Sequence, residues 1–150
     1  MKKILLTTAL FLTVGLSVLF AQSNKNTDPY LQASLKEHFT NAKDVSWKQV
    51  KNYTEATFTI DNKQLSVFYY EDNRPFAVSR NISSEQLPLA LLGSIKRNYS
   101  DYWITSLFEL SIDGHSEYYI TLENADRKKI LKSDGSSQWV TYNPAEKTAM

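Results

Sequence analysis

The fold is decided by residues 29–50, which read PYLQASLKEHFTNAKDVSWKQV. Leu31, Leu35 and Phe39 recur at every fourth position, so on a helix they form one apolar stripe. From Val45 onward the apolar residues alternate with polar ones, which is the period of a strand. This stretch therefore predicts a helix that gives way directly to sheet.

The same pattern returns about 60 positions later, in residues 89–110, LALLGSIKRNYSDYWITSLFEL. Leu91, Ile95 and Tyr99 repeat the spacing of the first triplet, and alternating segments again follow. Each unit is too short to bury its apolar face alone, so we expect two paired copies. The predicted fold class is α+β, a tandem repeat of one helix and four antiparallel strands (α-β4-α-β4) with the helices packed on one face of the sheet.

Both predicted helices carry start signals. Asp28 can cap free backbone N–H groups, and Pro29 suits a first helical position because it has no N–H to lose. Ser83 and Gln86 resemble a capping box, and Pro88 falls where a first helical turn tolerates it. The helices are expected to run to about residues 42 and 100.

Short β-branched and aromatic segments separated by turn residues predict the strands. Asp61-Asn62, Asp113-Gly114 and Asp134-Gly135 are typical of hairpin turns. Strands are expected at 45–51, 53–60, 65–70 and from 76 in the first unit, and at 103–112, 116–123, 127–132 and 137–142 in the second.

The chain begins with the features of an exported protein. Residues 1–21 carry two lysines, a long apolar run and a terminal Ala21, which predicts a signal peptide; an uncleaved membrane anchor is the alternative. Residues 22–28 are polar and are predicted to be a flexible linker. Residues 29–145 then form a single domain of two repeats, about 29–82 and 83–145. We expect a periplasmic or secreted protein with no membrane span once the signal is removed.

Composition excludes several functions. Without residues 1–21 the chain has 15 basic and 16 acidic residues, a net charge of −1, which gives no electrostatic basis for nucleic-acid binding. It has no cysteine, no glycine-rich phosphate loop and two isolated histidines, His38 and His115. We therefore predict no catalytic residues, no metal site, no cofactor and no enzymatic activity.

Aromatic residues are the remaining functional signal, with nine Tyr, seven Phe and three Trp. In a strand, neighbours such as Tyr69 and Tyr70 point to opposite faces, so one ring of each adjacent pair must leave the helix-covered core. These outward rings would suit recognition of a protein or peptide. The alternative is that both sheet faces are buried and the rings are ordinary core. The candidate binding residues are Phe68, Tyr70, Trp103, Tyr119 and Trp139.

Several of these motifs resemble one family of small exported bacterial proteins. They are Phe39 followed by Val45-x-Trp47, the acidic turn Glu71-Asp72-Asn73, Ile82 followed by Leu87-Pro88, and the turn Asp134-Gly135. Over about residues 30–142 the chain resembles the PepSY-like, beta-lactamase-inhibitor-like periplasmic proteins. A glycine-bearing turn is usual in that family where this chain has Asn73-Arg74.

The resemblance implies an exported, non-enzymatic protein of that fold; the family name refers to the fold of a beta-lactamase inhibitor and not to inhibition itself, and an inhibitor-like role is one form that binding could take. Together with the surplus rings it predicts binding of a protein or peptide through a β-sheet surface. Two alternatives remain open: a small carbohydrate-binding or carbohydrate-active envelope protein, and a structural envelope protein without a dedicated site.

Overall fold

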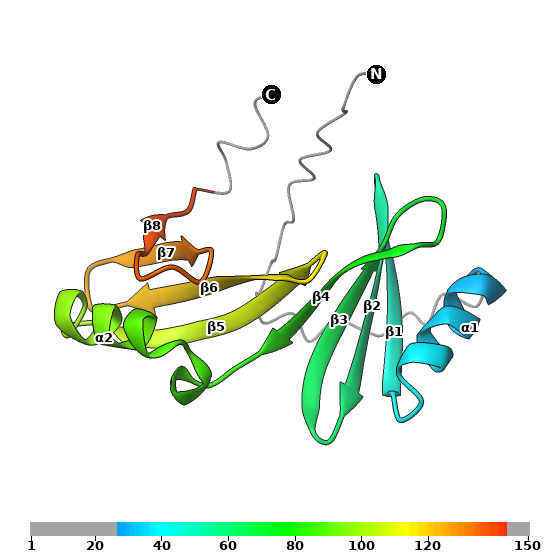
Figure 1. Cartoon of the computed structure of the whole chain (residues 1–150), viewed down its shortest axis with the longest axis horizontal. Helices are drawn as coiled ribbons and strands as arrows, with labels where there is room; N and C mark the ends of the chain where they lie inside the picture. The colour runs from blue at the N-terminus through cyan, green and yellow to red at the C-terminus, as the bar shows by residue number, and fades with distance from the viewer. Residues whose placement is uncertain (1–26, 144–150) are drawn as a thin grey trace.

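The computed structural model describes residues 27–143, so the expected signal peptide and most of the linker lie outside the described residues. Two helices and eight strands follow one another in the order helix, four strands, helix, four strands (Figure 1). We call the part up to the end of the fourth strand the first half and the remainder the second half. The helices are α1 (Pro29–His38) and α2 (Leu89–Asn98), and the strands are β1 (Lys43–Val50), β2 (Tyr53–Ile60), β3 (Lys63–Tyr69), β4 (Pro75–Asn81), β5 (Trp103–Ile112), β6 (His115–Glu123), β7 (Lys128–Ser133) and β8 (Val140–Thr141).

All eight strands belong to one antiparallel sheet in which each strand pairs with the next along the chain. The α+β class is therefore confirmed. The junction between the halves is the pairing of β4 with β5, which runs from Ala77 opposite Ile112 to Asn81 opposite Phe108. In Figure 1 the helices lie at opposite ends of the molecule, with β4 crossing between the two halves.

The start of α1 follows the sequence prediction. The carboxylate of Asp28 accepts a hydrogen bond from the backbone N–H of Tyr30 at 2.9 Å, and Pro29 is the first helical residue. The helix ends at His38, four residues before the expected end, because Phe39 leaves the helical conformation with φ −134° and ψ 68°.

The second helix begins later than predicted. Leu87 has φ −68° and ψ 148°, the extended conformation that the residue before a proline prefers. Pro88 therefore separates a short 3₁₀ turn at Ser84–Gln86, labelled η1, from α2. Gln86 Oε1 does accept a hydrogen bond from the Ser83 N–H at 2.9 Å, so the predicted capping contact forms but caps η1 alone.

Tight turns connect β2 to β3 and β5 to β6. Asp61 and Asn62 have φ of 49° and 60°, and Asp113 and Gly114 have φ of 48° and 80°, as the mirror-image hairpin turns require. Asn73 has φ 65°, so it adopts the left-handed conformation in the turn between β3 and β4. The expected hairpin at Asp134-Gly135 is instead a longer connection, and the last strand is only two residues long.

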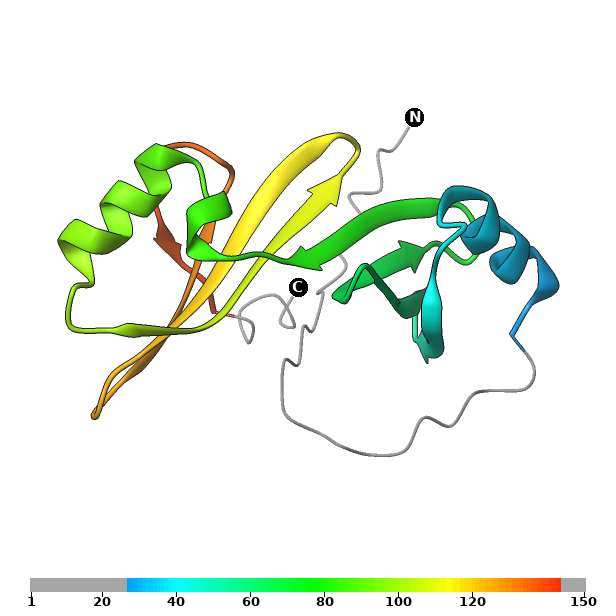
Figure 2. The same cartoon turned by 90° about the horizontal axis from the view of Figure 1, so that it is seen from below.

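Both helices pack on the same face of the sheet, as Figure 2 shows. Leu31 and Leu35 of α1 are buried against β2 and β3, and Leu91 and Ile95 of α2 are buried against β5, β6 and β7. Burying a leucine or isoleucine side chain stabilises the fold by about 1.5–3 kcal/mol. The helix stripes therefore fix which face of the sheet is covered.

A third buried cluster lies on the opposite face and draws on both halves. It contains Tyr53, Phe68, Ala77, Phe108, Leu110 and Tyr119, with Val50, Phe76, Ile112 and Tyr142 packed around it. No helix of residues 27–143 lies over this cluster, so its members cover one another across the sheet.

Candidate functional site

The candidate site is the face of the sheet that carries no helix. Strand pairing fixes which side chains point there, since Val67 and Val78 are paired on the helix-bearing face and Phe68 and Ala77 on the other. We call the following residues the helix-free surface: Ser46, Thr57, Ser66 and Ser79 in the first half, Trp103, Ile130 and Val140 in the second half, and Tyr53, Phe68, Phe108 and Tyr119 between them.

A row of hydroxyl side chains crosses the first half. Strand pairing places Ser46 opposite Thr57, Thr57 opposite Ser66, and Ser66 opposite Ser79. Thr57 Oγ1 and Ser66 Oγ are 2.9 Å apart, within hydrogen-bond distance. Ser66 and Ser79 are buried, at 9% and 6% exposed, and Ser46 and Thr57 are partly buried, so little of this row is open to solvent. Sequence reasoning missed this row, although the small polar residues of β1–β4 were readable once their register was known.

The rings of the buried cluster form a rigid base beside this row. Phe108 and Tyr119 are stacked at 5.0 Å between ring centroids, and Tyr53 meets Phe68 edge-on at 5.8 Å. Phe68 is 1% exposed and Tyr119 is 7% exposed, so the expectation that their rings are open to a partner is wrong. They do point away from the helices, but neighbouring rings on the same face cover them.

Tyr119 is also held by polar contacts. Its hydroxyl donates to Glu117 Oε2 at 2.9 Å, while Lys132 Nζ lies 2.6 Å from Glu117 Oε1 and 5.5 Å from the centroid of the Tyr119 ring. Burial, and then the hydrogen bond to the negative Glu117, raise the pKa of Tyr119 far above its ordinary value. The phenol therefore stays protonated and serves as a fixed donor, not as an acid or base.

The second half of the helix-free surface is open to solvent. Trp103 is 55% exposed and Val140 is 57% exposed, and Ile130 is half-buried. An ion pair between Lys128 Nζ and Glu123 Oε1, 2.8 Å apart, borders Trp103. An exposed tryptophan and valine beside a polar border are typical of recognition surfaces.

The remaining two predicted residues lie elsewhere. Trp139 is on the helix-bearing face, where its Nε1 donates to the carbonyl oxygen of Leu91 at 3.1 Å, so the expectation that it shares a surface with Trp103 is wrong. Val140, which pairs with Lys132, takes the outward place because neighbouring strand residues alternate between faces. Tyr70 is half-buried at the edge of the ring cluster, with its ring 4.4 Å from that of Phe76.

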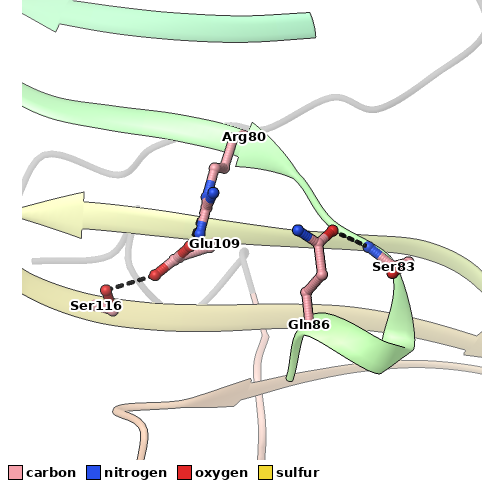
Figure 3. A network of polar contacts seen from close by, with 5 residues as sticks. All are labelled: Arg80, Ser83, Gln86, Glu109 and Ser116. Atoms are coloured by element: carbon pink, nitrogen blue, oxygen red, sulfur yellow. Dashed lines mark hydrogen bonds and ion pairs between the residues drawn. The ribbon is translucent and has the colours of Figure 1, made fainter. Parts of the chain in front are cut away.

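A separate polar network joins the halves on the helix-bearing face (Figure 3). Arg80 Nε donates to Glu109 Oε2 at 2.7 Å, and Ser116 Oγ donates to Glu109 Oε1 at 2.6 Å. Burial favours a higher pKa for Glu109, but the hydrogen bonds from Ser116 and Arg80 and the charge of Arg80 outweigh it and hold the pKa below its ordinary value. A carboxylate so engaged is a structural clamp between β4 and β5.

The histidines and acids of residues 27–143 do not gather into a metal centre. No group of three or more His, Asp or Glu side chains in this range is placed to hold a metal ion. His38 Nδ1 donates to the Ser34 carbonyl oxygen at 2.9 Å on the surface of α1, and His115 is exposed at the β5–β6 turn. Within the same range no helix has both the length and the apolar character that a membrane span requires.

Comparisons with known proteins relate the chain to others by fold. No family model and no curated protein matches it. A BLIP-like protein from Bacteroides fragilis NCTC 9343 has a similar structure, with a TM-score of 0.66 and 19% identity over 79% of this chain and 89% of that protein. A DUF2874 family protein from Bacteroides ovatus ATCC 8483 gives a TM-score of 0.70 at 16% identity over 79% and 89% of the two chains.

A third solved structure, from Bacteroides eggerthii DSM 20697 and provisionally described as periplasmic, gives a TM-score of 0.73 at 15% identity over 79% of this chain and 89% of that one. At sequence identities this low, the structural similarity shows that the fold is shared and shows nothing more. The resemblance to beta-lactamase-inhibitor-like proteins that the sequence indicates is thus confirmed for the fold, whereas the PepSY-like assignment stays a prediction.

Proposed function

We propose that this chain is an exported, non-enzymatic protein that binds a protein or peptide partner through its helix-free surface. The observation that carries the proposal is that both helices cover one face of the sheet. The other face is left with an exposed tryptophan in the second half and a rigid aromatic base where the halves meet. Rigid rings lose little conformational entropy on binding, which favours them as interface anchors.

Two features support this function over an enzymatic one. The carboxylates of Glu109 and Glu117 are both occupied by hydrogen bonds and ion pairs. The fold is shared with a BLIP-like protein and with a protein provisionally described as periplasmic, which supports both an inhibitor-like role and export by the predicted signal peptide. The periplasm, or release from it, is the proposed location.

We also propose that residues 29–82 and 83–145 are copies of one ancestral unit. Leu31 and Leu35 in α1 occupy the places that Leu91 and Ile95 occupy in α2, each pair buried against its own half of the sheet. The order of elements, helix followed by four strands, is the same in both parts.

Site-specific photocrosslinking tests the proposed surface. A photoreactive phenylalanine analogue at position 103 is expected to give one discrete adduct in the native cell envelope. The same analogue at Leu89, which is 86% exposed on the helix-bearing side, is the matched control and is expected to give none. Equal adducts from both positions, or none from position 103, would argue for a structural protein without a dedicated site.

The inhibitor-like form of the proposal has its own test. If the purified protein slows nitrocefin hydrolysis by a beta-lactamase, Trp103→Ala should relieve that inhibition by about tenfold or more, as expected for loss of an interface anchor. Leu89→Ala is the control and should leave inhibition unchanged. Inhibition that both variants retain would place the contact outside the helix-free surface.

A further inference from the structure

A hollow at the end of the first half is separate from the exposed part of the helix-free surface. It lies beside the start of α1, where β1 and β2 meet the loop that follows β3, and its volume is about 610 Å³. A volume of this size is within the range of small-molecule sites, roughly 300–1,000 Å³. Its lining includes Asp28 at the start of α1 together with Trp47, Gln49, Thr54, Tyr70, Glu71 and Asn73.

Tyr70 and Glu71 also line a second hollow of about 710 Å³, which extends toward Asn52 and the β5–β6 turn at Asp113. Tyr70 and Glu71 thus form a wall that the two hollows share. An elongated ligand could occupy both of them and pass the ring of Tyr70, which packs against Phe76 at 4.4 Å between centroids and has the Arg74 guanidinium 5.8 Å from its own centroid.

Hydrogen bonds fix the polar side chains of the first hollow. Thr54 Oγ1 donates to Gln49 Oε1 at 2.7 Å, and Asn73 Nδ2 donates to Asp28 Oδ2 at 2.8 Å. These bonds leave Asn73 Oδ1 as an acceptor for a ligand. Among residues 27–143 the exposed carboxylate of Glu71 has no hydrogen-bond or ion-pair partner.

We propose that the two hollows together bind a neutral oligosaccharide. A sugar ring has flat C–H faces and a rim of hydroxyl groups. The rings of Trp47 and Tyr70 suit the apolar faces, and the amides and the Glu71 carboxylate suit the hydroxyl groups, which both donate and accept hydrogen bonds.

The charges of the lining disfavour anionic ligands. The first hollow has no lysine or arginine in its wall, so it offers nothing to balance an anion. In the second hollow Arg74 is bound to Asp72, with its NH2 2.7 Å from Asp72 Oδ2. Asp28 accepts hydrogen bonds from the neutral groups of Tyr30 and Asn73, so both it and Glu71 keep their negative charge, and a cationic ligand is the competitor that the experiment below tests.

The proposal is independent of the partner proposed for the helix-free surface, because Trp103 and Val140 belong to the other half of the sheet. The three tryptophans give a direct readout. In residues 22–150, the expected exported form, the indole N–H signals of Trp47, Trp103 and Trp139 can be followed by NMR and assigned with single Trp→Phe variants.

The experiment titrates this protein separately with cellohexaose, xylohexaose, maltohexaose and chitohexaose, and with hexalysine as the cationic probe. At least one hexasaccharide is expected to shift the Trp47 signal saturably while the Trp103 and Trp139 signals stay in place. Glu71→Gln should weaken this binding about tenfold, since it removes hydrogen bonds to a charged group from an exposed side chain that no fold contact uses.

Tyr70→Ala should abolish most of the binding, and Glu85→Gln, an exposed acid of η1, is the control that should not change it. Each variant's thermal midpoint is measured to show that it is folded. The proposal is overturned if no hexasaccharide moves the Trp47 signal, if Glu71→Gln and Tyr70→Ala leave the binding unchanged, or if hexalysine alone produces the shift.

Discussion

At the scale of single residues, Glu109 shows how one side chain can join two halves of a sheet. It accepts hydrogen bonds from Arg80 on β4 and Ser116 on β6, and it lies on β5 between them. Its carboxylate is mostly shielded from water, whereas Arg80 is half-exposed. The contact therefore contributes as a hydrogen-bonded clamp more than as a long-range charge interaction.

Glu109→Gln is expected to lower the free energy of unfolding by about 1 kcal/mol at pH 7. Because the pKa of Glu109 is depressed in the folded state, its charge stabilises the protein above the ordinary glutamate pKa of about 4.3, and this stabilisation is lost as the pH falls through the folded-state pKa. The difference between wild type and variant should therefore shrink from pH 5 to about pH 3. Urea unfolding at each pH measures it, and a difference that grows on acidification would contradict the assignment.

The rings of the helix-free surface separate into structural and exposed residues. Phe68→Ala should cost about 3–5 kcal/mol of stability because it opens a cavity in a buried cluster. Trp103→Ala should change stability by no more than about 0.5 kcal/mol, since more than half of that side chain is already in water. Chemical denaturation of both variants makes the comparison, and similar losses would mean that Trp103 is part of the core.

At the scale of elements, turn geometry determines how the strands meet. Gly114 has φ 80° in the β5–β6 turn, a conformation that strains any residue with a Cβ atom, although an added Cβ would meet no atom within 4 Å. In α2, by contrast, Gly93 has helical geometry, and an added Cβ would meet only the flexible guanidinium of Arg97, at 3.1 Å. The two glycines therefore differ in why they are present.

Alanine substitutions should reveal this difference by their sign. Gly114→Ala is expected to destabilise the protein by about 1 kcal/mol through backbone strain. Gly93→Ala should stabilise it by about 0.5–1 kcal/mol, since alanine is the better helix former and Arg97 can move aside. Thermal unfolding measures both, and a destabilised Gly93→Ala variant would show that α2 needs close approach at that position.

The helices and strands were the part of the structure that the sequence predicted best. The spacing of Leu31 and Leu35, and of Leu91 and Ile95, correctly indicated two helices on one face, because a helical stripe depends on local periodicity. The boundary at Pro88 could also have been predicted, since a proline biases the residue before it toward extended backbone. The capping-box pattern of Ser83 and Gln86 indicated an earlier helix start instead, because in the structure it caps η1.

At the scale of the whole molecule, prediction was weaker because it depended on contacts between the halves. Alternation alone correctly turned Phe68 and Tyr119 away from the helices but could not show that rings of both halves meet and bury one another there. The placement of Trp139 failed for a related reason. A shift of one residue in a two-residue strand moves a side chain to the other face, and only the pairing of β8 with β7 decides which face it is.

The shared cluster makes the two halves dependent on each other. Tyr53 and Phe68 come from the first half, and Phe108 and Tyr119 come from the second. Fragments 22–82 and 83–150 are each expected to lack a cooperative thermal transition, because each leaves about half of this cluster exposed to water. Mixing them should restore dispersed NMR spectra close to that of residues 22–150. A fragment that melts cooperatively by itself would show that the halves are independent domains.

The strictly sequential strand order has a consequence for how the protein is made. During synthesis each new strand pairs with the strand made just before it, and the connection to close is short except between β4 and β5, where residues 82–102 carry η1 and α2. Nothing in this order requires a late strand to insert between two early ones. The slow step should then be the packing of Phe108 and Tyr119 against Tyr53 and Phe68 once β6 has formed. Until then, the nascent first half would expose Tyr53 and Phe68 as a surface that chaperones can bind.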